Sequence, residues 1–234
     1  MPPEYVDLQP PGHILPNFRE VYQFCARLNA RGWRPDYVID VGASTGIWSG
    51  TVSEVFTDAK FLLCDPLFES YAEAWEKPCM ERVKVAIADK PGELMLSVSK
   101  DLYGSSLVAV ENKANEVKVQ VSTVDILVTE RRLTGRCLLK ADVQFAEHLV
   151  ISGAMHTLKT ACDFIILELT VPRVTAEART LLEMSNWLDD LGFCITDIVG
   201  SWRAPSTGEI KQLDVAFMRK DLKLGPIHWN QQLS

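Results

Sequence analysis

The feature that most constrains this chain is an apolar run that leads directly into a turn with two glycines, residues 37–46 (YVIDVGASTG). The run predicts a buried strand, and a helical pattern opens near Ile47. Glycines let the backbone of the turn approach a ligand closely, and the first N–H groups of the helix would face the same ligand. The segment therefore predicts a nucleotide-binding turn, and its cofactor-binding residues are expected to be Gly42, Ala43, Ser44, Thr45 and Gly46.

A second apolar run, residues 61–64, ends in Asp65-Pro66. Asp65 lies about 20 residues beyond the turn, where a dinucleotide-type site places the carboxylate that binds ribose hydroxyls. The turn itself separates two classes of cofactor. A pyrophosphate needs a glycine where Ser44 stands, whereas Asp40 is suited to hold the cationic amino group of a methionine moiety. We therefore expect S-adenosylmethionine as the cofactor, and an NAD-dependent oxidoreductase is the alternative.

Composition limits the class of protein. The chain has 234 residues, of which 47% are hydrophobic, and this suits one α/β domain with a substantial core. Its net charge of −7 argues against a nucleic-acid partner, because phosphate backbones require clustered Lys and Arg. We find no run of about 18 apolar residues and no signal-like segment, and expect a soluble, cytoplasmic protein without a membrane span. The six cysteines are scattered and the four histidines lack zinc-like spacing, so we expect reduced thiols and no metal site.

The chain begins with a proline-rich stretch, residues 1–17, which predicts an irregular arm. Apolar residues then recur at helical spacing from Phe18 to Leu28, and Gly32 is the expected C-cap. We expect this helix to cover the sheet, and a lid or a homodimer contact are the alternatives. The expected organisation is an arm and helix at 1–36, a cofactor-binding domain at 37–222 and a tail at 223–234.

Short β-rich runs alternate with helical patterns, which predicts an α/β fold with a mostly parallel, seven-stranded sheet and helices on both faces. The strands are expected at 37–41, 61–64, 83–87, 137–141, 164–169, 194–199 and 213–218, and the helices near 47–56, 68–77, 146–159 and 174–191. Residues 93–98 and 117–121 alternate apolar and polar side chains and predict a small inserted antiparallel pair. The ligand should lie at the carboxyl ends of the parallel strands.

Several short motifs follow the turn in a characteristic order. They are Asp65-Pro66, AIAD at 86–89, GSSL at 104–107, STVD at 122–125 and LLKADVQFAE at 138–147. With these motifs the chain resembles FkbM-type methyltransferases over roughly residues 37–200, and the last block is the most specific part. The resemblance implies a class I, Rossmann-like fold that depends on S-adenosylmethionine. It also implies methylation of hydroxyl groups on sugars, lipids or natural products.

The resemblance also implies roles for individual residues. Ala88 and Asp89 are expected beside adenine, and the strand end from Lys140 to Gln144 near the transferred methyl group. The expected substrate-side residues are Ser105, Ser106, Gln144 and Glu168. Phe145 departs from the family block, which has glycine at this place. Its ring either narrows the acceptor pocket or points away and affects packing alone.

Asp142 is the first candidate for the general base, because it ends a strand on the face where the cofactor is expected; capping of the following helix is its structural alternative. Lys140 is expected to hold the acceptor or to pair with Asp142. Glu147 and His148 are rival candidates, and Glu147 also suits the first turn of a helix. We predict an S-adenosylmethionine-dependent O-methyltransferase of a small-molecule or sugar hydroxyl in natural-product or glycan biosynthesis. The alternative of a different class is a non-catalytic domain of this fold that binds cofactor or a partner, and Phe145 motivates it.

Overall fold

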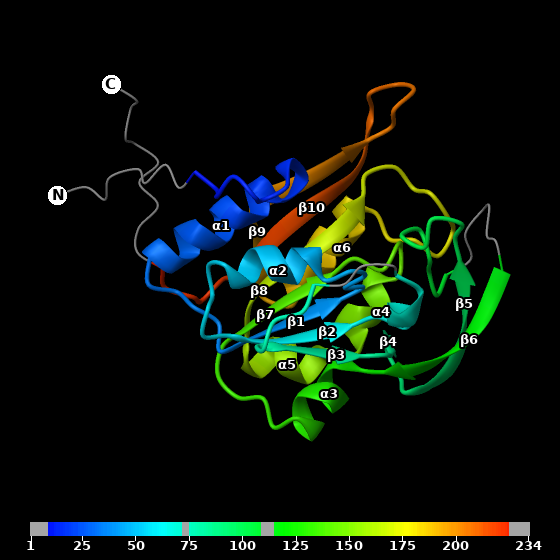
Figure 1. Cartoon of the computed structure of the whole chain (residues 1–234). Helices are drawn as coiled ribbons and strands as arrows, with labels where there is room; N and C mark the ends of the chain where they lie inside the picture. Colours follow the sequence, from blue (N-terminus) through cyan, green and yellow to red (C-terminus); the bar gives the residue numbers. More distant parts are fainter. Residues whose placement is uncertain (1–8, 72–74, 109–114, 225–234) are drawn as a thin grey trace.

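The computed structural model describes residues 9–71, 75–108 and 115–224. Its centre is a seven-stranded sheet in the order β3-β2-β1-β7-β8-β10-β9 (Figure 1). These strands are β1 (Tyr37–Val41), β2 (Lys60–Cys64), β3 (Met80–Val83), β7 (Cys137–Ala141), β8 (Cys162–Thr170), β9 (Phe193–Arg203) and β10 (Ile210–Arg219). Strands β3, β2, β1, β7 and β8 pair in parallel, and β10 runs antiparallel to both of its neighbours. The predicted mostly parallel sheet is confirmed.

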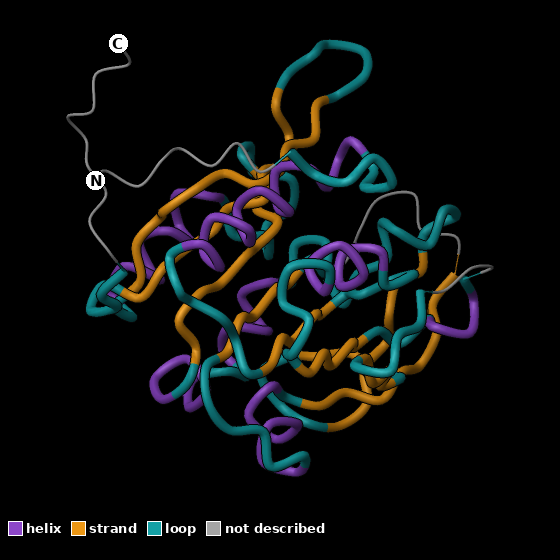
Figure 2. Tube along the Cα trace, turned by 60° about the vertical axis from the view of Figure 1, so that its left-hand side comes forward, coloured by secondary structure: helices purple, strands orange, loops and turns teal. Residues whose placement is uncertain are grey.

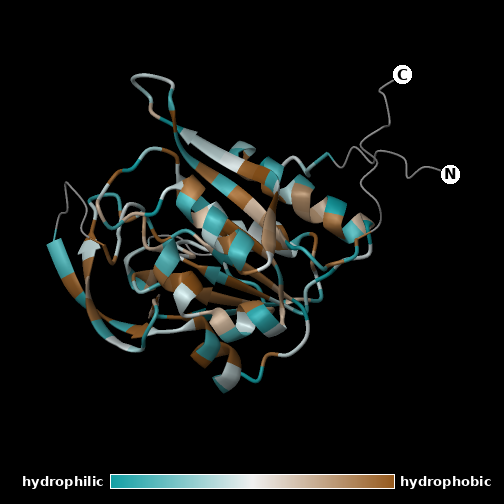
Figure 3. Cartoon of the chain, turned by 180° about the vertical axis from the view of Figure 1, so that it is seen from behind, coloured by the Kyte–Doolittle hydropathy of each residue, from teal (hydrophilic) through white to brown (hydrophobic). Residues whose placement is uncertain are grey.

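Helices cover both faces of this sheet. One face carries α1 (Arg19–Ala30) and α2 (Ile47–Ser53), and the other carries α3 (Val124–Glu130), α4 (Glu147–Ser152), α5 (Met155–Thr160) and α6 (Leu181–Asp190). Because successive strand residues point to opposite faces, Val38 belongs to the core under α1 and α2, and Ile39 belongs to the other core. Figure 3 shows the resulting apolar strands beneath helices of mixed hydropathy.

A smaller sheet, β4-β6-β5, flanks the central one. Strand β5 (Gly92–Val98) pairs antiparallel with β6 (Asn115–Ser122), as predicted for the insertion, and β4 (Ala86–Ile87) adds a parallel partner to β6. The hairpin of β9 and β10 projects beyond the rest of the molecule (Figures 1 and 2). No helix in the described residues has the length and apolar character needed to cross a membrane.

The N-terminal helix covers the sheet. Val21, Cys25 and Leu28 of α1 are buried in the core that α1 shares with α2. Gly32 follows with φ of 78°, the left-handed conformation expected of a glycine C-cap. A 3₁₀ turn, η1 (Pro16–Phe18), leads into the helix. All six cysteines are free thiols, and four of them are buried.

Four predicted elements differ from the structure; one is the helix expected at 174–191, which begins only at Leu181. The run at 83–87 is divided, because β3 pairs with β2 whereas β4 pairs with β6. In place of a helix at 68–77, the described part holds a 3₁₀ turn, η2 (Phe68–Ser70). Further along, the N–H of Trp75 donates to the backbone oxygen of Thr45 in the glycine turn. The helix expected at 146–159 is interrupted at Gly153, where a Cβ would lie 2.1 Å from Ala88 O.

Candidate active site

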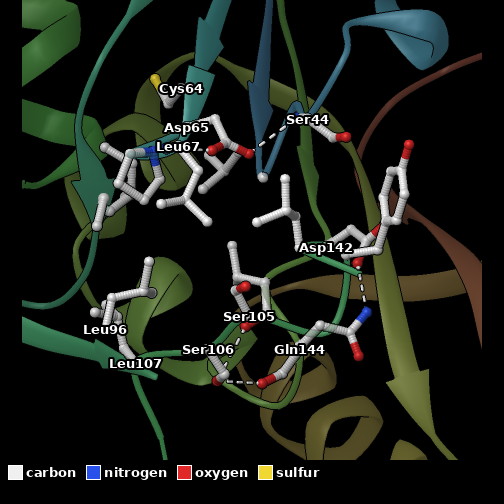
Figure 4. Close-up of a pocket in the computed structure, with 18 of the residues that line it drawn as sticks. Ser44, Cys64, Asp65, Leu67, Leu96, Ser105, Ser106, Leu107, Asp142 and Gln144 are labelled. Atoms are coloured by element: carbon white, nitrogen blue, oxygen red, sulfur yellow. Dashed lines mark hydrogen bonds between the residues drawn. The ribbon is translucent and has the colours of Figure 1, made fainter. Parts of the chain in front are cut away.

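A cavity of about 220 Å³, here called the first cavity, opens at the carboxyl ends of β1 and β2. The glycine turn and Asp65 form one wall, and Asp142 and Gln144 form another (Figure 4). Apolar side chains close the remaining sides; they include Leu67, Ile87, Leu96 and Leu107. The first cavity therefore combines a flat apolar slot with polar groups at its edge.

Asp65 lies at this edge in a defined orientation. Its Oδ2 accepts the backbone N–H of Ser44 at 2.9 Å, and its Oδ1 accepts the N–H of Leu67 at 2.7 Å. Burial raises the pKa of Asp65 above its ordinary value, while the two N–H donors oppose that rise. The carboxylate predicted from the spacing is thus held in place at the cavity wall by the turn itself.

The turn requires glycine at position 42. Gly42 has φ of 71°, and a Cβ there would lie 1.9 Å from the backbone oxygen of Asp142. The loop after β7 therefore packs directly onto the turn after β1. Ser44 also adopts a positive φ, 51°, which directs its N–H to Asp65. Two segments almost a hundred residues apart in the sequence thus form one continuous rim.

Asp40 is fully buried and is not among the residues that line the cavities. It is the register partner of Lys140 across β1 and β7, and its Oδ1 lies 3.0 Å from Lys140 Nζ. Ser49 of α2 donates to its other oxygen at 2.7 Å. Burial alone would lower the pKa of Lys140, but Asp40 and then Asp142 raise it above its ordinary value. Lys140 is therefore a permanent cation that also donates to Gly42 O at 2.9 Å.

A second cavity, of about 450 Å³, adjoins the first on the face covered by α1. Both cavities are lined by Gly42, Ser44, Tyr103, Asp142 and Glu168. Phe18, Trp48 and Trp202 contribute aromatic surface to the second cavity. Among its polar residues, Lys140 lies on β7, Glu168 on β8, and Gln212 and Asp214 on β10.

Two glutamine amides hold Glu168 between the cavities. Gln144 Nε2 donates to Glu168 Oε2 at 2.7 Å and to Asp142 Oδ1 at 3.1 Å. Gln212 Nε2 donates to the same oxygen of Glu168 at 2.6 Å. Burial, followed by the charges of Asp142 and Asp214, raises the pKa of Glu168 well above its ordinary value. Gln144, Asp142 and Glu168, predicted separately as site residues, therefore form one hydrogen-bonded group.

Asp214 and Gln212 join this group although the sequence reasoning did not select them. Strand β10 is antiparallel to β8, so its first residues lie at the carboxyl end of β8, and Asp214 is the register partner of Glu168. Burial, followed by the charge of Asp142, raises the pKa of Asp214 to about 7. The sequence signal that could have identified Asp214 is an acidic residue between two apolar residues of a strand, Leu213-Asp214-Val215.

Besides Asp40, four predicted site residues are not among those that line the cavities: Gly46, Ala88, Asp89 and Glu147. Glu147 is buried at the start of α4, where it accepts the N–H of Val143 at 3.0 Å, and burial raises its pKa to about 8. Ala88 is buried and Asp89 is exposed, and neither is among the lining residues. Ala86 and Ile87, earlier in the same motif, line the first cavity instead.

Ser105 and Ser106 line the first cavity, not the second. The hydroxyl of Ser106 donates to the backbone oxygen of Gln144 (Figure 4) and thereby joins the inserted sheet to the loop after β7. Phe145, next in that loop, is half-buried and is not among the residues that line either cavity. Its φ of 75° lies in the left-handed region that favours glycine. Of the two alternatives for Phe145, a ring that points away from the acceptor pocket fits this geometry.

The described residues contain no group of three or more histidine, cysteine or acidic side chains arranged to hold a metal ion. The strand order and the cavity at the carboxyl ends of β1 and β2 define a class I, Rossmann-like methyltransferase fold. A family model described as the methyltransferase FkbM domain matches residues 40–195. The chain therefore belongs to the FkbM methyltransferase family, and it is an S-adenosylmethionine-dependent methyltransferase.

The backbone fold of the chain is similar to that of several solved structures. One is magnesium protoporphyrin IX methyltransferase from Synechocystis with bound S-adenosylmethionine, at 17% identity and a TM-score of 0.44 over 89% of this chain and 85% of that one. Another is a methyltransferase of 1,6-didemethyltoxoflavin from Burkholderia thailandensis with S-adenosylhomocysteine, at 13% identity and a TM-score of 0.42 over 88% and 80%. A search of curated protein sequences finds no match. The family assignment rests on the matched domain.

Proposed function

We propose that this protein transfers a methyl group to a hydroxyl of a small molecule or sugar, in natural-product or glycan biosynthesis. One observation carries the proposal: the two cavities meet at Asp142 and Glu168. A donor in the first cavity and an acceptor in the second would therefore face each other beside a carboxylate. Such an arrangement supplies the alignment that methyl transfer requires, worth roughly 7–11 kcal/mol of barrier in well-oriented systems.

The residues of the first cavity fit S-adenosylmethionine. The cofactor, when bound, supplies a methyl group on a positively charged sulfur. Asp65 is placed to bind ribose hydroxyls, and Ile87, Leu96 and Leu107 offer apolar surface for the adenine. The backbone at Gly42, which leaves no room for a Cβ, would hold the methionine part. Asp40 acts on this part through Lys140 and the turn, since it is buried behind them.

Asp142 is the proposed general base. Its side chain is 35% exposed, lines both cavities and is oriented by the amide of Gln144. When the acceptor hydroxyl takes the methyl group that the bound cofactor would supply, the carboxylate of Asp142 would accept the hydroxyl proton. A positioned base contributes about 10²–10⁴-fold to the rate. Glu147 is a positioning residue, because it holds the N–H of Val143 directly after Asp142.

Calorimetric titration with S-adenosylmethionine and S-adenosylhomocysteine, with NAD as a control ligand, tests the cofactor site. We expect micromolar binding of both adenosyl ligands and a marked loss of affinity in Asp65→Ala. Asp58→Ala, an exposed acid at the turn before β2, is the matched control and should bind as the native chain does. Absence of binding to the native chain, or a preference for NAD, would refute the assignment.

Formation of S-adenosylhomocysteine with a panel of hydroxylated acceptors tests the reaction. We expect turnover by the native chain, and a loss of about 10²–10⁴-fold in kcat for Asp142→Asn with cofactor affinity retained. Cofactor binding with no turnover on any acceptor, followed by turnover in Phe145→Gly, would instead favour the non-catalytic alternative.

A further inference from the structure

The charges around the second cavity are unbalanced. The charged side chains that line it are one cation, Lys140, and three acids, Asp142, Glu168 and Asp214. Lys140 is already paired with Asp40, a fourth acid that is fully buried behind the wall of the cavity. Lys140 therefore shares its charge between Asp40 and Asp142, whose Oδ2 lies 3.8 Å from Nζ, and no second cation among the described residues lines the cavity to balance Glu168 and Asp214.

Hydrogen bonds from glutamine amides stabilise the carboxylates of Asp142 and Glu168, whereas Asp214 receives none from the described residues. Gln144 donates to both Asp142 and Glu168, and Gln212 donates to Glu168. For the carboxylate of Asp214, the described part of the chain provides no hydrogen-bond donor and no ion-pair partner within 4.0 Å. The carboxylate of Asp214 is half-buried and lines the cavity, so a ligand in the cavity can reach it.

The backbone makes room for this carboxylate. Asp214 is the register partner of Gly200 on β9, and a Cβ at Gly200 would lie 2.1 Å from Asp214 Oδ2. The backbone at Gly200 does not have a positive φ, so its conformation would accept other residues. A side chain at position 200 would therefore displace the Asp214 carboxylate from its present position, and glycine leaves room for it there.

The apolar part of the cavity is aromatic. Trp48 and Phe18 line it from α2 and η1, and Trp202 of β9, which is 50% exposed, lines it near the hairpin. The ammonium of Lys140 already lies over one of these rings, with Nζ 6.0 Å from the ring centre of Trp48. Aromatic faces attract ammonium groups, and a cavity of about 450 Å³ is of the size that small ligands occupy.

We propose that the acceptor bound in the second cavity carries a protonated amine, which Asp214 and Glu168 bind, in addition to the hydroxyl that faces Asp142. The inference rests on the proposed function and specifies the chemical class of its substrate: a compact amino sugar or amino alcohol. The ammonium replaces the partner that Asp214 lacks, and the aromatic rings cover its carbon frame.

Protonation of Asp214 is consistent with this geometry. Its pKa of about 7 is set by burial and by Asp142, and is opposed by Lys140, with a further contribution from Glu20 of α1. Glu168 faces it from β8. A bound ammonium would favour the ionised carboxylate, so binding should release protons near neutrality and strengthen as pH rises from about 6 to about 8.

Three sugars that differ only at carbon 6 test the proposal. They are 6-amino-6-deoxyglucose, glucose and glucuronate, which carry an ammonium, a hydroxyl and a carboxylate at the same place. Their affinities are measured by ligand-observed NMR on the full chain saturated with S-adenosylhomocysteine. We expect the amine to bind about tenfold more tightly than glucose, and glucuronate to bind most weakly. Equal binding of the three, tighter binding of glucose or glucuronate, or no binding of the amine would overturn the proposal.

Asp214→Asn separates this charge effect from shape, because the amide occupies the same volume. We expect the variant to bind the amine and glucose alike and to retain its affinity for S-adenosylhomocysteine, since Asp214 lines the second cavity and not the first. Asp221→Asn, an exposed acid after β10, is the matched control and should keep the tenfold preference. A preference that persists in Asp214→Asn would contradict the inference.

Failure of this inference is distinguishable from failure of the proposed function. If the proposed function is wrong, no hydroxylated acceptor is methylated, whether or not S-adenosylhomocysteine binds. If only the substrate class is wrong, hydroxylated acceptors are methylated and the three sugars show no preference for the amine.

Discussion

Lys140 and Asp40 face each other across β7 and β1, with Lys140 Nζ 3.0 Å from Asp40 Oδ1 and both side chains buried. The sequence pointed to one as a catalytic residue and to the other as a ligand of the cofactor. In the structure each is the principal partner of the other. Because Lys140 also donates to Gly42 O, the pair fixes the turn from behind and presents Asp142, 3.8 Å from Nζ, to the cavities.

Removal of the cation should be costly. Lys140→Met leaves the carboxylate of Asp40 buried without its partner, and we expect a loss of about 3–5 kcal/mol in the free energy of unfolding. Denaturant unfolding followed by circular dichroism measures it. The double variant Asp40→Asn with Lys140→Met should recover much of that loss, because no uncompensated charge remains. Lys90→Met, an exposed lysine, is the control; a Lys140→Met variant as stable as this control would disprove the structural role.

The stability of the protein should depend on the protonation of Glu147. Its pKa is about 8 in the folded chain, against an ordinary value of 4.5, because it is buried. Between these values the folded state holds a proton that the unfolded state has lost, so the contribution of Glu147 to stability falls as pH rises, by about 1.4 kcal/mol per pH unit. Glu147→Gln keeps an acceptor for Val143 N–H and removes this dependence.

Unfolding free energies measured between about pH 5 and pH 8 test this prediction. The native chain should lose stability more steeply than Glu147→Gln, and Glu130→Gln, an exposed acid at the end of α3, should follow the native chain. Parallel pH profiles for the native chain and Glu147→Gln would show that Glu147 is ionised in the folded state.

Gly42→Ala should damage the cofactor site. A Cβ at this position would lie 1.9 Å from Asp142 O, and φ of 71° is unfavourable for alanine, so the turn and the loop after β7 must separate. We expect at least a tenfold loss of affinity for S-adenosylhomocysteine in calorimetry, together with lower stability. Gly12→Ala, where a Cβ meets nothing within 4 Å, should behave as the native chain. Unchanged binding by Gly42→Ala would mean that the turn does not hold the cofactor.

Glycine should be more stable than alanine at position 145, because the backbone there has a positive φ. At φ of 75°, glycine avoids the strain that a Cβ produces, which is roughly 1–2 kcal/mol for a left-handed residue. We therefore expect Phe145→Gly to be about 1 kcal/mol more stable than Phe145→Ala in denaturant unfolding, since both variants lack the ring. At Asn186, exposed within α6, the order should reverse, with alanine the more stable by about the same amount. The same order at both positions would refute the strain at Phe145.

The strands were the most predictable part of the fold. Buried parallel strands are apolar on both faces, so β1 and β7 have the bounds expected from their apolar runs, 37–41 and 137–141. The inserted pair was predictable from its alternation. The segment expected as a helix at 68–77 was less predictable, because its Trp75 N–H donates to Thr45 O of the distant glycine turn, a contact that local periodicity does not contain.

The candidate site was predictable where it follows strand ends. Asp65 and Asp142 directly follow the parallel strands β2 and β7, and Glu168 lies near the end of β8. All three line a cavity, as the rule for ligand sites at carboxyl ends indicates. The rule did not identify Asp214, because β10 runs antiparallel to β8. The first half of β10, and not its end, therefore reaches the site. Their catalytic and binding roles stay predictions until the variants are measured.

The sequence by itself determined the alternation of strands and helices, the glycine turn and the family, because these depend on residue types at short spacings. Tertiary structure decided which acids face a ligand. Asp40 lies one residue before the end of β1 and Asp142 one residue after the end of β7. Asp40 is nevertheless enclosed by Lys140 and Ser49, whereas Asp142 lines both cavities. That difference arises from which side chains pack over each position, and packing joins residues whose separation along the chain has no fixed period.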